Sequence, residues 1–123
     1  MKLRIRGNSI RLRLTQSEVV QLATEGHVQN VTSFGNAELK YAVVTSNSER
    51  MEADLRDNEI TVCVPQPMIA EWAASEQIGI AESQAVRDDE LQILVEKDFA
   101  CIKPRHGEED SDTFTNPLAA GNG

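Results

Sequence analysis

The chain has 123 residues, of which 40% are hydrophobic and 26% are charged, and its formal net charge at pH 7 is −8. This length suits one domain around one core, and the low aromatic content of 4% requires a core of aliphatic side chains. A net negative charge repels nucleic acids and anionic membranes, so we expect neither as a partner.

The first fourteen residues, MKLRIRGNSIRLRL, alternate charged and apolar side chains. They contain no continuous apolar run, so they predict neither a secretory signal nor a transmembrane segment. The only cysteines are Cys63 and Cys101, which are too few for a disulfide framework. We therefore expect a cytoplasmic protein with reduced thiols.

Alternating apolar residues predict strands over residues 2–6 and 10–14, joined by a tight turn at Gly7-Asn8. The next four residues, TQSE, match a capping box in which Thr15 and Glu18 satisfy each other's backbone amides. This motif predicts a helix over residues 16–25, which Gly26 terminates.

The rest of the chain repeats these signals. Strands are expected over residues 28–34, 38–46, 50–56 and 59–64, the last two forming a hairpin around Asp57-Asn58. Pro65 ends the last of them, and a second helix follows around Pro67 with Met68, Ile69, Trp72 and Ala73 as its buried stripe. Two further strands are expected over residues 78–84 and 91–102.

This order, ββαββββαββ with mostly hairpin links, predicts an α+β fold with two helices and a mostly antiparallel sheet of six to eight strands. The predicted domain covers residues 1–103. Residues 104–123 turn to charge, Gly, Asn and Pro, so we expect an acidic, flexible C-terminal tail. No strong internal repeat is visible, although residues 2–25 and 50–76, each a hairpin followed by a helix, hint at a distant one.

The stretches MKLRIRGNSIRLRLTQSEV and VEKDFACI, with the acidic EEDSD before Phe114 and Asn116-Pro117, resemble a small bacterial family carried as a domain of unknown function. The resemblance spans nearly the whole chain and rests on its two ends. In that family a proline often precedes the Asn-Pro of the tail, where this chain has Thr115. The resemblance implies a bacterial cytoplasmic protein and implies no activity.

The first hairpin is the main candidate site, because its polar face carries five of the twelve cations of the chain. Arginine presents a two-pronged donor to phosphate oxygens, so this face is a candidate anion-binding site. The alternative is a solvated sheet face whose cations pair with neighbouring strands, for example with Glu38, Glu52 or Asp54. The five candidate residues are Lys2, Arg4, Arg6, Arg11 and Arg13.

Three other sites are weaker. Glu96 and Asp98 share one strand face and could hold a cation or exchange protons, but no Ser, His or Cys pairs with them, so we predict no catalytic residue. Zinc-ligand residue types occur near the C-terminus without a Cys-x-x-Cys motif, so we predict no metal site and no cofactor. These are Cys101, His106, Glu108 and Asp110.

The acidic tail could fold onto the cationic hairpin. Exposed ion pairs contribute only ~0–1 kcal/mol each, whereas fixing the backbone costs about 1–2 kcal/mol per residue. Docking of the tail, on this chain or on a partner, therefore needs apolar anchors, and the candidates are Phe114, Pro117 and Leu118.

Two classes of function remain. The preferred hypothesis is a non-enzymatic domain that binds a protein partner or a phosphorylated small molecule through the hairpin face, the tail, or both. The alternative is an enzyme acting on phosphate or polyphosphate with a divalent ion held by Glu96 or Asp98, similar to a triphosphate-tunnel protein, although the opening strand KLRIR lacks that family's Glu-x-Glu-x-Lys. The enzyme requires Arg4 and Arg13 to meet Glu96 and Asp98 in one concave pocket. An unpaired edge strand would also allow a homodimer.

Overall fold

The structure is a computed structural model that describes residues 1–99. The predictions for the acidic tail, for Cys101 and His106, and for Phe114, Pro117 and Leu118 lie outside the described residues.

The predicted order of elements is confirmed. The described residues form β1 (Lys2–Arg6), β2 (Ser9–Leu14), α1 (Gln16–Glu25), β3 (His27–Ser33), β4 (Glu38–Ser46), β5 (Glu52–Arg56), β6 (Glu59–Pro65), α2 (Gln66–Ala74), β7 (Gly79–Val86) and β8 (Asp89–Lys97).

Local chemistry explains where α1 starts and stops. The Thr15 hydroxyl accepts from the amide of Glu18, and the Glu18 carboxylate accepts from the amide of Thr15, which is the expected capping box. Gly26 ends the helix with φ 81°, and its amide donates to the carbonyl of Leu22. A left-handed backbone at this position favours glycine because it has no Cβ.

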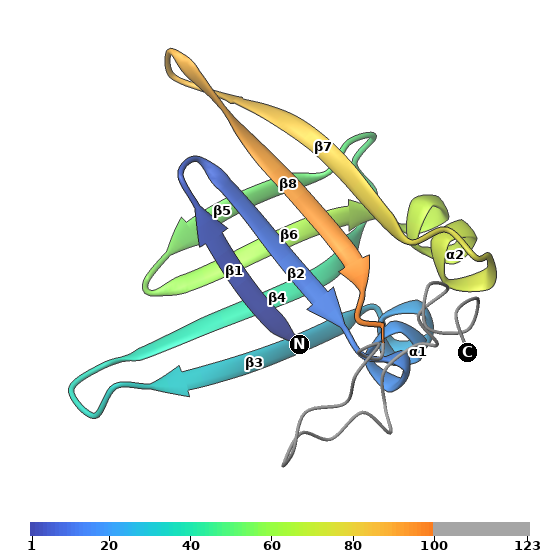
Figure 1. Ribbon diagram of the computed structural model, residues 1–123, viewed down its shortest axis with the longest axis horizontal. Helices are drawn as coiled ribbons and strands as arrows, with labels where there is room; N and C mark the ends of the chain where they lie inside the picture. Colours follow the sequence, from blue (N-terminus) through green and yellow to red (C-terminus); the bar gives the residue numbers. More distant parts are fainter. Residues whose placement is uncertain (100–123) are drawn as a thin grey trace, which may run out of the picture.

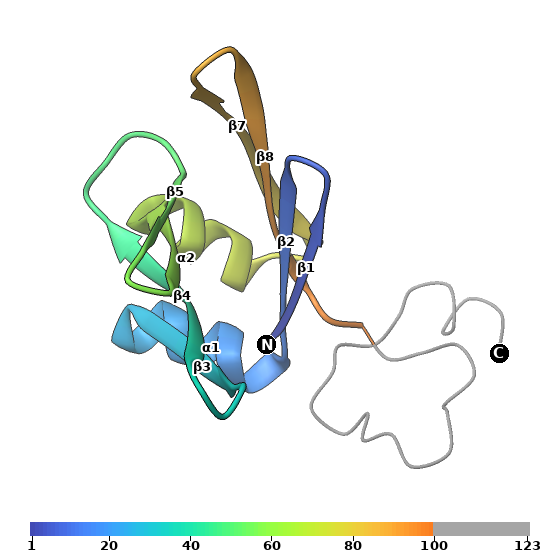
Figure 2. The same cartoon turned by 90° about the vertical axis from the view of Figure 1, so that its left-hand side faces the viewer.

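The strands form two four-stranded sheets rather than one, in the orders β1-β2-β8-β7 and β3-β4-β6-β5. Figure 2 shows them as two layers that face each other. Each hairpin pairs its own strands antiparallel, and each sheet joins two hairpins through one parallel pair, β2 with β8 and β4 with β6. The α+β class and the mostly antiparallel pairing are thus confirmed.

The hint of an internal repeat corresponds to a twofold architecture. The first unit (residues 2–46) and the second unit (residues 52–97) each run strand, strand, helix, strand, strand. Strands β1, β2, β3 and β4 of the first unit are equivalent to β5, β6, β7 and β8 of the second. Replacing each strand by its equivalent converts the order β1-β2-β8-β7 into β5-β6-β4-β3, which is the order of the other sheet. Each unit therefore donates its first hairpin to the sheet that contains the other unit's second hairpin.

The core lies between the sheets and under the helices. Its largest fully buried side chains include Trp72 of α2 and Leu22 of α1, which are equivalent in the two units. The indole Nε1 of Trp72 donates to the carbonyl of Ile78 at 3.1 Å, so the polar edge of the ring is satisfied inside the core. Figure 1 shows both helices at the end of the sheets where β2 and β8 finish.

The hairpin tips lie at the opposite end, away from both helices of the described residues (Figure 1). Ile5 of β1 and Leu55 of β5 point toward the inside of the sandwich by strand alternation, yet they are 59% and 67% exposed. Met51 and Ala53, at alternate positions before Leu55, are buried, so the exposure of Leu55 follows from its position at an uncovered tip.

The last predicted strand is shifted. We expected it over residues 91–102, but β8 begins at Asp89 and ends at Lys97 within the described residues. The Asp98 amide leaves the ladder and donates to the carbonyl of Leu14, at the end of β2. The predicted end of this strand, at residue 102, lies outside the described residues.

No helix among the described residues is long and apolar enough to cross a membrane.

Substituting alanine at Gly26 and at Gly7 separates backbone strain from crowding. Both glycines have positive φ, 81° and 53°, but a Cβ at Gly26 would lie 2.9 Å from Oγ1 of Thr45, whereas a Cβ at Gly7 would meet nothing within 4 Å. We expect Gly7→Ala to lower the free energy of unfolding by ~1–2 kcal/mol and Gly26→Ala to lower it by at least about 1 kcal/mol more. Urea unfolding with an unchanged m-value measures both, and equal losses would contradict the crowding at Thr45.

Candidate functional site

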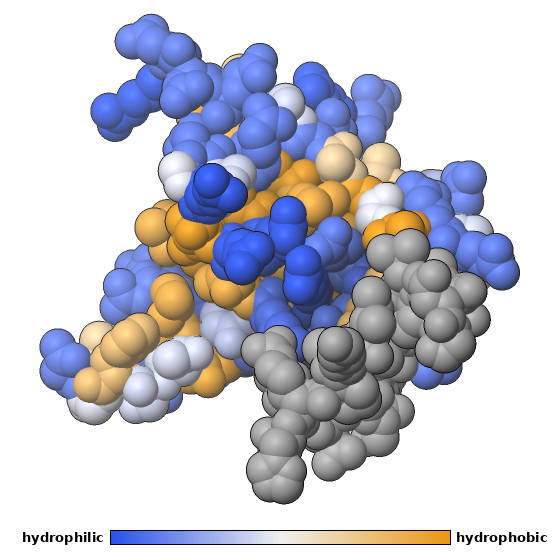
Figure 3. All heavy atoms as spheres, in the orientation of Figure 1, coloured by the Kyte–Doolittle hydropathy of each residue, from blue (hydrophilic) through white to orange (hydrophobic). Residues whose placement is uncertain are grey.

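The five predicted cations gather on the outer face of the first hairpin, and Figure 3 shows a hydrophilic surface over β1 and β2 bordered by apolar surface. In the antiparallel register Lys2 faces Arg13 and Arg4 faces Arg11. Like charges directly opposite each other are unfavourable, so this face requires nearby carboxylates or a ligand.

Glu96 of β8 supplies one of these carboxylates. Its Oε1 lies 2.7 Å from Nε of Arg13 and 3.6 Å from Nε of Arg11, and its side chain is 16% exposed. The parallel pairing of β2 with β8 sets Arg13 directly beside Glu96 in the register. Cross-strand neutralisation therefore exists for Arg11 and Arg13. The three predicted partner carboxylates are wrong, because they lie in the other sheet, on β4 (Glu38) and on β5 (Glu52 and Asp54).

Lys2 is held by a second carboxylate. Its Nζ lies 3.2 Å from Oδ2 of Asp98, which is buried. Arg4 and Arg6 differ from the other three cations because neither forms an ion pair within residues 1–99, and both are exposed. They belong to β1, an edge strand that pairs with β2 on one side and with no other described strand on the other side.

The end of β8 is anchored beneath α2. Lys97 is buried, its Nζ donates to the carbonyl of Ser75 at the C-terminus of α2, and it lies 5.8 Å from the centre of the Trp72 ring. A cation is favoured at a helix C-terminus. Burial nevertheless lowers the pKa of Lys97, an effect that nearby Glu76 partly offsets.

A small apolar groove, the tip groove, lies between the tips of the first hairpin and the β5–β6 hairpin. It has a volume of about 280 Å³ and is lined mainly by Ile5, Ile10, Leu55, Ile60, Val86 and Leu91. Binding sites for small molecules typically span about 300–1,000 Å³. The tip groove is therefore suited to one or two apolar side chains rather than to a cofactor.

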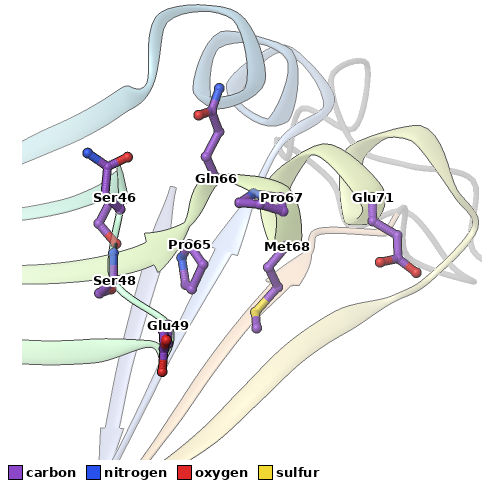
Figure 4. A pocket seen from close by; sticks show the side chains of 9 residues that line it. Ser46, Ser48, Glu49, Pro65, Gln66, Pro67, Met68 and Glu71 are labelled. Carbon is purple, nitrogen blue, oxygen red and sulfur yellow. Dashed lines mark hydrogen bonds between the residues drawn. The ribbon is translucent and has the colours of Figure 1, made fainter.

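A larger hollow of about 650 Å³ lies beside the N-terminus of α2 (Figure 4). Glu49 and Glu71 stand on either side of Met68 in this view, and the hydroxyls of Ser46 and Ser48 hydrogen bond to each other at 2.7 Å. Among the described residues that line it there is no cation and no histidine. The two carboxylates disfavour an anion at this helix terminus, and the serines have no neighbouring base.

No described pocket brings together the four residues that the enzyme hypothesis requires. Arg13 meets Glu96 and Lys2 meets Asp98 on the surface of a sheet, and Arg4 joins neither pair. Among residues 1–99, no three His, Cys, Asp or Glu side chains are placed to hold a metal ion.

Charge divides the two units unequally. The first unit carries six cations and three carboxylates, whereas the second carries three cations and eleven carboxylates, so their net charges are +3 and −8. The hairpins show the same inversion, since Lys2 and Arg4 are replaced by Glu52 and Asp54 at the equivalent positions. Two hairpins of one architecture therefore present opposite charge.

Comparison with known proteins gives one family. A family model described as "Family of unknown function (DUF7009)" matches residues 1–118. The chain belongs to this family. Searches of the curated proteins and of the solved structures each gave no match. The resemblance expected from the two ends of the sequence is thus confirmed, and the match also covers most of the C-terminal segment.

Three features of the site were not predicted from the sequence. The pairing of Arg13 with Glu96 depends on a parallel contact between strands 83 positions apart. The burial of Lys97 depends on α2 lying over the end of β8. The tip groove depends on two hairpins meeting, and its only signal is the shared positions of Ile5 and Leu55 in the two units.

A double-mutant cycle on Arg13 and Glu96 should measure the ion pair between β2 and β8. We expect a coupling free energy of about 0.5–1.5 kcal/mol from Arg13→Ala, Glu96→Ala and the double variant, because the carboxylate is shielded from water. The control pair, Arg56 with Asp54, has a similar distance of 3.2 Å but side chains 83% and 52% exposed. Its coupling should be near zero, and equal couplings would contradict the importance of burial.

Cys63 should be a slow nucleophile. Burial raises the pKa of its thiol, and the charges of Asp54 and Glu52 raise it further. Asp54→Asn, made in a Cys101→Ser background, should therefore lower the pKa of Cys63. Alkylation of Cys63 by neutral iodoacetamide at pH 8 should then become faster. The increase should be less than about tenfold, which is the change that a full pKa unit would give. Asp57→Asn is the control, and an equal increase there would contradict a specific effect of Asp54.

Proposed function

We propose that this chain is a non-enzymatic binding domain that recognises an acidic, extended segment of a partner protein through β1 and the cationic face of the first hairpin. We also propose that the protein functions in the bacterial cytoplasm. The low cysteine content and the family resemblance support this location.

The observation that carries the proposal is the state of Arg4 and Arg6. They are exposed and have no ion-pair partner within residues 1–99, whereas Lys2, Arg11 and Arg13 are held by Asp98 and Glu96. The held cations lose freedom to reach a ligand, and the other two keep it. Arg4 and Arg6 therefore supply the free positive charge of this surface.

The edge of β1 adds a second contribution. An edge strand presents unpaired backbone groups, and an extended peptide can add to it as a further strand. Alternating acidic side chains in such a peptide would lie beside the alternating cations of β1. A second copy of β1 would instead bring like charges together, which disfavours a homodimer through this edge.

Reversing the charge of Arg4 and Arg6 tests the proposal. A fluorescent ten-residue peptide that alternates Glu and Val should bind the wild-type chain, and Arg4→Glu/Arg6→Glu should weaken it at least about tenfold because attraction becomes repulsion. Fluorescence anisotropy measures both. The affinity of the wild type should also fall at about 1 M salt, where the Debye length is ~3 Å.

The matched control reverses two other exposed arginines, Arg50 and Arg56. Arg56 occupies in the second hairpin the position that Arg6 occupies in the first. Each variant replaces two arginines by glutamates, so the net charge changes equally in both. Arg50→Glu/Arg56→Glu should keep the affinity within about twofold. Equal weakening in the two variants would reduce the effect to net charge and would contradict the proposal.

The phosphate alternative makes a different prediction. Polyphosphate with a divalent cation, at 100 times its dissociation constant, would raise the stability of a true receptor by about 2.7 kcal/mol. A thermal-shift measurement detects this rise. A rise that requires both the cation and Glu96 would favour the enzyme hypothesis over the peptide-binding proposal.

A further inference from the structure

We infer that residues 100–118 of this chain bind in cis along the free edge of β1 and insert Phe114 and Leu118 into the tip groove. The segment would then occupy the proposed binding surface and compete with a partner for it. The inference builds on the proposed function, and the experiment below separates the failure of one from the failure of the other.

The first argument is where the described chain leaves the domain. The amide of Asp98 donates to the carbonyl of Leu14 at 2.8 Å, and its carboxylate lies 3.2 Å from Nζ of Lys2. The segment therefore starts beside the first residue of β1. From that point β1 runs toward the tip groove, which Ile5 lines.

The second argument is length. Leu91 lines the groove and Lys97 ends β8, so the groove lies about 20 Å from the exit, at ~3.3 Å per residue of strand. The fifteen residues from position 100 to Phe114 reach as far as ~50 Å when extended. The segment can follow β1 and still turn into the groove.

The third argument is charge. Four carboxylates lie between the exit and Phe114, and no cation lies between Arg105 and Phe114 in the sequence. A segment on the edge of β1 brings them beside Arg4 and Arg6, the two cations without an ion pair within residues 1–99. These carboxylates are Glu108, Glu109, Asp110 and Asp112.

The fourth argument is the tip groove itself. Ion pairs at the surface are weak, so the segment needs apolar anchors. Ile5 and Leu55 expose 59% and 67% of their surface around a groove of about 280 Å³, which suits one or two large side chains. Figure 3 shows apolar surface around these hairpin ends. Phe114 and Leu118 are spaced to enter it on either side of the turn that Asn116-Pro117 favours.

The extent of the family match agrees with this assignment. The family model continues past the last described strand and ends at residue 118, so it includes both anchors and excludes the last five residues. A segment that docks on the domain belongs to the same unit as the domain. A partner would have to displace it, so docking lowers the apparent affinity of the surface.

Hydrogen exchange on the full chain tests the inference. Amides of β1 that point away from β2 should exchange at least about tenfold faster in Phe114→Ala/Leu118→Ala than in the wild type, because the variant loses the anchors. The control, Thr115→Ala/Asn116→Ala, keeps both anchors and should remain within about threefold of the wild type. Equal exchange in the wild type and the anchor variant would overturn the inference.

Two further readouts complete the experiment. Protection that is independent of protein concentration supports binding in cis, and protection that rises with concentration overturns it in favour of a second copy. The anchor variant should also bind the Glu-Val peptide at least about fivefold more tightly than the wild type. If no variant binds the peptide while β1 stays protected by the anchors, the proposed function fails and docking in cis stands.

Discussion

The fold depends on two parallel strand pairs, β2 with β8 and β4 with β6, because each joins hairpins from different units. Without them the chain would hold four separate hairpins, and an isolated hairpin is marginally stable in water. Neither unit completes a sheet with its own strands. The helices follow from this exchange, since α1 and α2 pack on each other at the end where the joined strands finish.

The two junctions are stabilised differently. In the first sheet Arg11 and Arg13 meet Glu96 across the junction, whereas at the equivalent positions of the second sheet Thr61 and Cys63 lie beside Ala42 and Val44. Charge therefore contributes to the first junction, where the cationic first hairpin pairs with Glu96 of β8, and not to the second. Arg4 and Arg6 lie one strand further from the junction, on β1, where Glu96 does not pair with them. These two cations form the candidate surface.

The sequence predicted what depends on neighbours along the chain. The capping box of Thr15 and Glu18, the turn at Asp57-Asn58 with both φ values positive, and the order of ten elements were all read from short patterns. The division into two sheets was not, because alternation assigns a strand a buried face without naming its neighbour. For the same reason the cationic face was predicted but its partner Glu96 was not. The burial of Lys97 under α2 was not predicted either, because it depends on how a helix packs over a strand end.

The exchange of hairpins also has a consequence for synthesis, which proceeds from the N-terminus and lets early segments fold first. The second sheet is complete once β6 has emerged, at residue 65. The first sheet must wait for β8, so the cationic hairpin emerges first among the strands and finds its carboxylates last. Until then, Lys2, Arg11 and Arg13 lack the carboxylates of Asp98 and Glu96 that pair with them in the folded chain. The ion pairs of the first hairpin are thus among the last contacts of the domain to become possible during synthesis.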